Sequence, residues 1–590
     1  MPEGTPVSGR GTAGVPRILG VAALAALVLL LLLLLLLLLL ALALPPAAAQ
    51  TDTRIDGVLT LDGPVRIVGG EDVLITVDGT RYHDTIELAA DGQVVNELGM
   101  ERYVGGIAEM PSRWPLEALK AQAVAARTYA WWSAERGVHD GFDICATTAC
   151  QVFDGAEVVL NGGDRWAEAV AATAGEVLQR PDGDPILARY FSTSGGRTYA
   201  NEDVFSSTGP SPYLVAIEDP FDAVSPYHRW QVRFSREEFD EILSRGERLA
   251  ATVPVAEVAR TAAVDDVQAG FEVTGRDGTV VEVGAVELRD FLSLVAPQRF
   301  PDRFPTRRAD GLRPLPTTVP SSRFTVAVTD DEVVLDGRGW GHGVGMGQYG
   351  ARGRAQDGAD HVQILSAYYG GLVPEVSPQL PDRVRVGLGA RDELTWAGDG
   401  AVTIIDAAGE TIVDRAIGPW QARSTGSGWE LVPPEDSGRA LEVTRTEPVP
   451  ALTRPGAAVT VETRVNKHVL LRLEVEDADG SPVMTRHLGL AEPGTHAATW
   501  RLTDEQDVPV PVGTYLLTLV GEDATGARAG TATEVAVEQV ARPADGPGTN
   551  TLSGIVSGIL TVGGAAVALL VLILLLVLFV SFRRPTRSRP

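Results

Sequence analysis

Glu109 is the residue whose type and neighbours best suit acid–base chemistry. It opens the segment EMPSRWPLEALKAQAVAARTYA (residues 109–130), just before a helix-favouring run and behind a Pro-Ser turn. A carboxyl group beside apolar neighbours such as Met110 and Trp114 loses solvation, which raises its pKa and lets it keep a proton near neutral pH. The structural alternative is a carboxylate that stabilises a helix dipole. The segment therefore predicts a general acid or a helix-stabilising group at Glu109.

Two cations follow on the same predicted helix. Lys120 and Arg127 are seven residues apart, so they lie on nearly the same helix face, two turns distant. Such a pair could donate hydrogen bonds to a carboxylate or to a sugar oxygen. It could also be an ordinary solvated face of the helix.

Both cysteines of the chain lie in HDGFDICATTAC (residues 139–150), together with His139. A short disulfide between Cys145 and Cys150 suits an oxidising compartment. The His-x5-Cys-x4-Cys spacing also supplies three zinc ligands and leaves one coordination position for water or another side chain. The residues alone leave both alternatives open.

A glycine at every second position opens the segment GRGWGHGVGMGQYGA (residues 337–351). Its later part matches the dinucleotide-binding pattern GxGxxG, but no strand-helix-strand context surrounds it, so we exclude nucleotide binding. Alternating glycines instead allow close approach of the backbone to a neighbouring strand or to a glycan. Trp340 could stack on a sugar ring and His342 could donate to a sugar oxygen, or both could be packed core residues.

Four blocks in this order make the chain similar to a known family. Residues 109–130, YFSTSGGRTYANEDVF (190–205), PYLVAIEDPFD (212–222) and the glycine-rich segment resemble blocks of the stage II sporulation protein D family, over roughly residues 90–372. The resemblance implies a peptidoglycan lytic transglycosylase, which cleaves the bond between N-acetylmuramic acid and N-acetylglucosamine without water and leaves an anhydro sugar. Some relatives are instead amidase enhancers, which grasp glycan or a partner hydrolase without cutting.

The resemblance also implies roles for individual residues. Glu109 would be the single acid and base, so the second carboxylate of an inverting hydrolase is unnecessary. Because some members bind zinc with a similar ligand set, the resemblance favours a structural zinc ion at His139, Cys145 and Cys150. The residues implied along the glycan groove are Lys120, Gln122 and Arg127, with a Ser-Gly turn formed by Ser192, Ser194, Gly195 and Gly196.

The segments that must position these residues are predicted to form a mixed α+β central domain. Residues 114–136 are rich in alanine and lack glycine, and Pro115 suits a first turn, so they predict a long helix. A helix over 166–174, strands near 185–191 and 232–234, and a short helix over 236–244 complete an α+β domain without alternating βαβ units. Ahead of them, the alternation of apolar and polar residues over 51–108 predicts a lead-in of short antiparallel strands.

The rest of the chain predicts all-β modules and two membrane segments. The central domain, including a linker at 313–320, is expected to end at 375. A small β-rich region (376–447) and a β-sandwich (448–540) follow, and the sandwich resembles the immunoglobulin-like domain of flagellar hook-capping proteins. Residues 1–50 predict a signal peptide or an anchor, 541–554 a stalk, and 555–582 a transmembrane helix.

The charges of the chain decide its predicted topology and partners. Four arginines in the tail (583–590) favour a cytoplasmic C-terminus, which leaves the body of the chain outside. The net charge of -27, from 77 acidic and 50 basic residues, excludes nucleic acid as a partner. The sequence thus predicts a membrane-anchored, extracytoplasmic protein whose partners are peptidoglycan glycan strands and, in the enhancer alternative, a cell-wall amidase.

Overall fold

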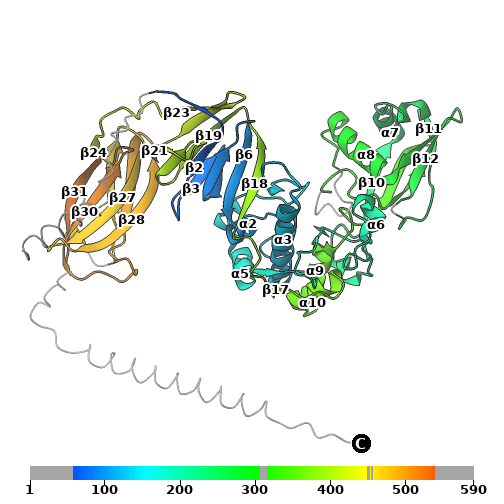
Figure 1. Cartoon of the computed structure of the whole chain (residues 1–590), viewed down its shortest axis with the longest axis horizontal. Helices are drawn as coiled ribbons and strands as arrows, with labels where there is room; N and C mark the ends of the chain where they lie inside the picture. The colour runs from blue at the N-terminus through cyan, green and yellow to red at the C-terminus, as the bar shows by residue number, and fades with distance from the viewer. Residues whose placement is uncertain (1–56, 267, 306–314, 448–451, 454–455, 539–590) are drawn as a thin grey trace, which may run out of the picture.

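The computed structural model describes residues 57–266, 268–305, 315–447, 452–453 and 456–538. Figure 1 shows β modules followed by a helical centre and a further unit of strands and helices. The predicted N-terminal signal or anchor, stalk, transmembrane helix and cytoplasmic tail all lie outside the described residues. Within the described ranges, no helix combines the length and the apolar character that crossing a bilayer requires.

Helix α3 (Leu116–Arg136) is the centre of the molecule and confirms the predicted long helix. It begins after Pro115, and it ends at Gly137, whose φ of 54° gives the left-handed cap that glycine adopts without strain. Its buried alanines are small, so neighbouring elements can pack closely against it. The other helices of this core are α2 (Met100–Gly105), α4 (Glu157–Leu160), α5 (Asp164–Ala172), α6 (Asn201–Val204), η1 (Ser206–Thr208), η2 (Pro220–Val224), α9 (Gln348–Gln356) and α10 (His361–Tyr368).

Regular strands are short in this core. Strand β9 (Tyr190–Phe191) pairs in parallel with β16 (Met346–Gly347), and β8 (Glu176–Val177) pairs with β17 (Glu375–Val376). The strand predicted near 185–191 is therefore reduced to two residues. The pairing of β9 with β16 nevertheless joins two of the blocks quoted above.

Residues 230–337 form a unit with its own hydrophobic core, built around Phe234, Phe271 and Leu288. Leu315 and Val319 are buried in that core, so the linker predicted at 313–320 is wrong for its described part. Strands β10 and β15 pair antiparallel, which returns the chain to the central core next to the point where it left. The elements are β10 (Trp230–Ser235), α7 (Arg236–Leu243), η3 (Leu249–Thr252), β11 (Val255–Arg260), β12 (Gly270–Gly275), β13 (Val280–Gly284), α8 (Ala285–Arg299), β14 (Phe324–Val328) and β15 (Glu332–Gly337).

The β lead-in and the region after residue 375 form one β module, although the sequence predicted two separate regions. A six-stranded sheet (β1-β23-β22-β19-β3-β4) and a seven-stranded sheet (β21-β20-β2-β5-β6-β18-β7) interleave strands from both regions. They share a core that contains Ile67, Ile86 and Trp396. The strands are β1 (Leu59–Asp62), β2 (Val65–Val68), β3 (Leu74–Val77), β4 (Thr80–His83), β5 (Thr85–Leu88), β6 (Gln93–Gly99), β7 (Ile144–Cys145), β18 (Arg383–Ala390), β19 (Glu393–Gly398), β20 (Val402–Ile405), β21 (Thr411–Ala416), β22 (Trp420–Ser424) and β23 (Gly428–Val432).

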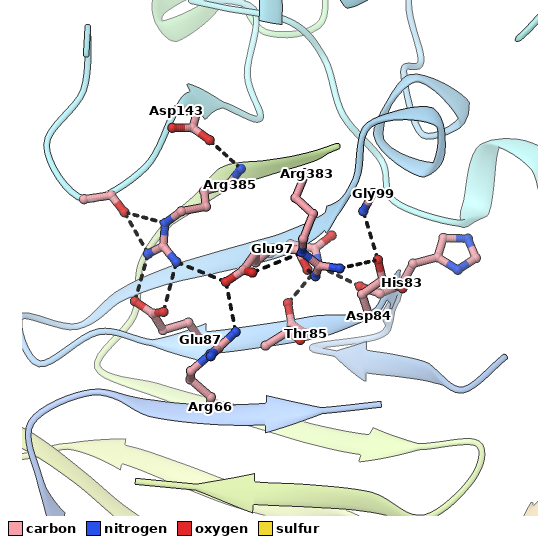
Figure 2. Close-up of polar contacts among 12 residues, drawn as sticks. Arg66, His83, Asp84, Thr85, Glu87, Glu97, Gly99, Asp143, Arg383 and Arg385 are labelled. Carbon is pink, nitrogen blue, oxygen red and sulfur yellow. Dashed lines mark hydrogen bonds and ion pairs between the residues drawn. The ribbon is translucent and has the colours of Figure 1, made fainter. Parts of the chain in front are cut away.

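An ion-pair network on the seven-stranded sheet holds the loop that precedes Cys145 (Figure 2). Arg385 on β18 donates to both carboxylate oxygens of Glu87, at 2.9 and 3.0 Å. The backbone N–H of Arg385 donates to Asp143 Oδ2 at 2.8 Å, and its side chain donates to the Gly141 carbonyl at 2.9 Å. Because β7 then pairs with β18, this network ties the start of the cysteine-bearing loop to the sheet.

The C-terminal module consists of two sheets around one core that includes Trp500. The sheets have the orders β24-β26-β29 and β25-β31-β30-β27-β28. The mixed α/β centre and the β-rich C-terminal region predicted from the sequence are thus confirmed. The strands are β24 (Val443–Arg445), β25 (Leu452–Thr453), β26 (Val459–Val465), β27 (Val469–Asp477), β28 (Pro482–Ala491), β29 (Gly494–Trp500), β30 (Gly513–Glu522) and β31 (Arg528–Val537).

Candidate functional site

A cleft of about 710 Å³ lies beside Glu109. Its walls come from the start of α3, the loop before and after Cys150, strand β9 and the glycine-rich segment that leads into α9. Many of the lining side chains are aromatic, as is common in sites that bind small organic ligands. The aromatic and polar lining includes Glu109, Trp114, Tyr129, Arg189, Tyr190, Phe191, Ser192, Phe205, Tyr227, Trp340, His342, Gln348 and Tyr349.

Glu109 sits in the cleft with its carboxyl group largely withdrawn from water. Met110 and Trp114 beside it are buried, and the backbone N–H of Val152 donates to Glu109 Oε1 at 2.9 Å. Burial raises the pKa of Glu109 above its ordinary value, whereas the hydrogen bond from Val152 N–H and the nearby polar groups of Gln348 and Tyr190 oppose this by favouring the carboxylate. No cation contributes to that balance, so the group is suited to hold a proton and to release it.

Four aromatic rings form a continuous wall of the cleft. Trp114 meets Tyr349 edge-on with 4.7 Å between ring centroids, and Tyr227 meets Trp340 edge-on at 5.0 Å. Tyr227 also contacts Tyr349, which connects the two pairs. Trp340 is only half-buried, so the structure puts it in the cleft wall as the sequence analysis expected of a sugar-stacking residue. Rings in such a wall can present faces or edges to a sugar.

His342 also lines the cleft, but its ring is engaged by the protein. Its Nδ1 accepts a hydrogen bond from the backbone N–H of Val344 at 3.1 Å, and its ring packs against Phe191 and Phe205. Burial lowers the pKa of His342 to about 4, while a hydrogen bond with the Tyr190 backbone acts in the opposite direction. His342 is therefore neutral at neutral pH, and this corresponds to the packed alternative that the sequence left open.

The alternating glycines allow close packing against neighbouring backbone. Gly343 and Gly345 have φ values of 82° and 79°, in the region that favours glycine. A Cβ atom on Gly345 would overlap the Arg189 carbonyl, and one on Gly343 would overlap the ring of Tyr199. Of the two predicted uses, approach to a neighbouring segment explains these two positions.

The Ser-Gly turn divides between the cleft and the core. Ser192 lines the cleft, but Ser194, Gly195 and Gly196 do not. The carboxylate of buried Asp222 accepts the backbone N–H groups of Ser194 and Gly195, both at 2.9 Å. Those N–H groups therefore satisfy an internal carboxylate, which corrects the prediction that they meet the sugar.

Lys120 and Arg127 lie outside the cleft lining, which corrects the predicted groove contacts. Arg127 is fully buried and donates to Glu101 Oε1 at 2.8 Å, to Glu101 Oε2 at 2.6 Å and to the Glu176 carbonyl at 3.0 Å. Lys120 pairs with Glu117 one turn earlier, at 2.8 Å. Both cations thus have partners within the protein that the spacing alone did not reveal.

Gln348 and Tyr190 are the polar neighbours of Glu109 that sequence reasoning missed. Gln348 hydrogen-bonds with Glu109, and its Nε2 donates to Gln122 Oε1 at 3.4 Å. The predicted groove residue Gln122 is fully buried, so it supports the site from behind. Their positions in the sequence could have indicated both residues, because Gln348 lies in GMGQYG and Tyr190 opens the YFSTSGG block.

The two cysteines form a disulfide in this structure, which is the alternative that the sequence analysis did not favour. His139 lies beside them, with its Nε2 3.3 Å from Cys150 Sγ. Potential ligand atoms of His139, Cys145 and Cys150 all lie within 4.8 Å of one another. Bonded sulfurs are not thiolates, so this donor set fits zinc only after reduction. Zinc at this place stays a prediction.

Asp219, in the block PYLVAIEDPFD, is a fully buried carboxyl group near the Ser-Gly turn. Its Oδ1 accepts a hydrogen bond from the Tyr368 hydroxyl at 2.8 Å. Burial is the main cause that raises the pKa of Asp219 from 3.8 to about 6. Folding therefore favours the protonated form of Asp219.

This raised pKa predicts a pH-dependent stability. The contribution of Asp219 is fully present below about pH 4 and is lost as pH rises through about 6, by about 3 kcal/mol in total. We expect Asp219→Asn to gain stability relative to wild type as pH rises from 4 to 7, measured as the difference in free energy of unfolding from urea titrations. A difference that stays constant over this range would contradict the assignment.

Parts of this chain are similar in sequence to known proteins. A family model described as stage II sporulation protein matches residues 89–179. The chain is 30% identical over 300 residues to the stage II sporulation protein D of Bacillus subtilis (strain 168), which covers 47% of this chain and 75% of that protein. It is 31% identical over 289 residues to the amidase enhancer of the same strain, covering 45% of this chain and 38% of that protein.

Among solved structures, FlgD from P. aeruginosa matches 13% of this chain and 60% of its own. The sequence identity is 20% and the TM-score is 0.13. A similarity at that TM-score carries no argument about function.

Proposed function

Because the chain belongs to the stage II sporulation protein D family, we propose that it is a peptidoglycan lytic transglycosylase with Glu109 as its single acid and base. The observation that carries this proposal is a half-buried carboxyl group with a raised pKa that lines an aromatic cleft. An acid for glycoside cleavage must hold its proton near neutral pH, and desolvation without a neighbouring cation favours this.

The proposed reaction uses one carboxyl group twice, first as an acid that gives up a proton and then as a base that takes up another. Protonated Glu109 gives its proton to the glycosidic oxygen as the bond from that oxygen to the muramic acid C1 breaks. The muramic acid's own hydroxyl then bonds to C1, and the Glu109 carboxylate takes the proton which that hydroxyl loses. The products are an anhydro sugar and a free N-acetylglucosamine end, and the enzyme returns to its starting protonation state.

The residues around Glu109 have complementary tasks in this proposal. The N–H of Val152 stabilises the carboxylate that exists between the two proton transfers, and the neighbouring polar groups of Gln348 and Tyr190 favour the same charged form. The aromatic wall that includes Trp340 would hold sugar rings by stacking. The test is direct: purified protein incubated with purified cell wall should release anhydromuropeptides, detected by mass spectrometry.

The alternative is a wall-binding protein that enhances an amidase without cutting glycan. The observation in its favour is the 31% identity to a protein named amidase enhancer. This alternative uses the same cleft, with a cell-wall amidase as partner. Wild-type protein that binds glycan but releases no anhydromuropeptide would favour it.

The proposed substrate requires the cleft to be outside the cytoplasm. We propose that the predicted apolar segments at residues 18–44 and 555–582 deliver the chain across the membrane and tether it there. The acidic net charge disfavours nucleic acid as a partner.

For the reduced chain we propose a structural zinc ion held by His139, Cys145 and Cys150. Zinc would supply no chemistry to the reaction and would pin the loop whose residues Thr148 and Ala149 line the cleft. We expect about one zinc per chain in protein purified with a reductant, a chelator-dependent fall in its melting temperature, and no zinc in the oxidised protein. Reduced protein that binds no zinc, measured by elemental analysis, would overturn this proposal.

A further inference from the structure

Arg189 is a cation in the cleft wall that has no role in the proposed reaction. It directly precedes β9, is half-buried, and lines the same cleft as Glu109. Its guanidinium lies over the ring of Phe205, with 3.7 Å from its central carbon to the ring centroid. This stacking fixes the plane of the guanidinium and leaves its edge for hydrogen bonds.

The guanidinium has no acidic partner among the described residues. Its Nε atom is buried without a hydrogen-bond partner there. Desolvation lowers the pKa of Arg189, and Tyr129 and Tyr213 act in the opposite direction. Arg189 in turn helps to lower the pKa of His342, which lines the same cleft.

Arg352 also has no ion pair among the described residues, but it packs over the rings of Trp114 and Tyr349 and does not line the cleft. Arg197, which is exposed and outside the lining, pairs with Glu218 at 2.7 Å.

A half-buried cation without an anion costs free energy, because its loss of hydration is not repaid within the protein. Burial and uncharged polar neighbours account for the direction of the shift in the pKa of Glu109, so Arg189 is not needed to explain it. No described residue forms an ion pair with this guanidinium, and its planar set of donors matches a planar two-oxygen anion bound in the cleft that Arg189 lines.

We propose that Arg189 binds a carboxylate carried by the glycan substrate and thereby selects which strands enter the cleft. The inference rests on the proposed function, because it assigns a group of that substrate to a residue of the same cleft. Two carboxylates of peptidoglycan share this chemistry: the lactyl carboxylate of muramic acid, free once the stem peptide is removed, and the carboxylates of the stem peptide itself.

The experiment compares Arg189→Gln with wild type on three substrates. These are intact peptidoglycan, glycan freed of stem peptides by an amidase, and the same freed glycan with its carboxylates converted to methylamides. Equilibrium binding is measured in a Glu109→Gln background, so that no cutting occurs, and release of anhydromuropeptides is measured with Glu109 present. Arg197→Gln is the matched control, since that arginine is exposed and paired outside the cleft lining.

We expect Arg189→Gln to weaken binding about tenfold or more on a carboxylate-bearing substrate and to leave binding to the methylamide unchanged. A loss confined to freed glycan identifies the lactyl carboxylate, and a loss confined to intact peptidoglycan identifies the stem peptide. Equal binding by wild type and Arg189→Gln on all three substrates overturns the proposal. Wild-type protein that binds but never cuts would refute the transglycosylase alone, because the binding measurements still decide the role of Arg189.

Discussion

Replacement of Glu109 by glutamine is expected to lower the release of anhydromuropeptides by about 10²–10⁴-fold, the range typical for loss of a general acid–base group. Glutamine has nearly the same shape and can still accept the hydrogen bond that Val152 N–H donates to Oε1. It has no proton to transfer to a glycosidic oxygen. The measurement is the rate of anhydromuropeptide release from purified cell wall, together with binding of the same material.

Glu117→Gln is the matched control for this variant. Glu117 lies in the first turn of α3, close in sequence to Glu109, but it accepts from Lys120 at 2.8 Å and from the backbone N–H of His361 at 2.9 Å, outside the cleft lining. We expect Glu117→Gln to keep its activity. If Glu109→Gln cuts as fast as wild type, the acid–base assignment fails, whatever the family.

Replacement of Arg127 by methionine is expected to lower the free energy of unfolding by about 2–3 kcal/mol. Arg127 is fully buried, and it binds both carboxylate oxygens of Glu101. Its loss leaves that carboxylate without its cation and leaves the Glu176 carbonyl without a donor. We place the effect below that of a wholly buried pair, because the Glu101 side chain is 41% exposed and water screens part of its charge.

Lys120→Met provides the comparison on the same helix face. Its pair with Glu117 is partly exposed and local, so the expected loss is at most about 0.5 kcal/mol. Urea titrations of both variants measure the difference. Specific activity per folded molecule should be unchanged in both. A selective loss of activity in folded Arg127→Met would restore the groove role that the sequence predicted.

Local sequence was enough to predict α3 and the environment of Glu109. Helix propensity, Pro115 and the apolar neighbours all act within a few residues, so their effects can be read along the chain. The family resemblance joined distant blocks, and the structure brings two of them together through β9 and β16. These are the parts of the fold and site that the sequence predicted correctly.

The errors concern partners far away in the sequence. Seven-residue spacing puts Lys120 and Arg127 on one face of α3, but it does not reveal that Glu101 faces Arg127. The sequence predicted strands over residues 51–108 and 376–447. Alternation of apolar and polar residues does not show which strands pair, however, so the sequence did not predict that both regions form one module. The pairing of Cys145 with Cys150 likewise depends on redox state, which spacing does not specify.

The pairing of β6 with β18 limits how the gene for this protein could be divided into separately exchanged segments. Strand β18 begins at Arg383, beyond the predicted end of the central domain, and it lies between β6 and β7 in one sheet. A genetic cassette that ended at residue 375 would strip β6 and β7 of their shared neighbour and release the cysteine loop. Recombination that preserves the cleft must therefore carry the later strands along with it, so the heritable unit extends past the predicted boundary of the central domain.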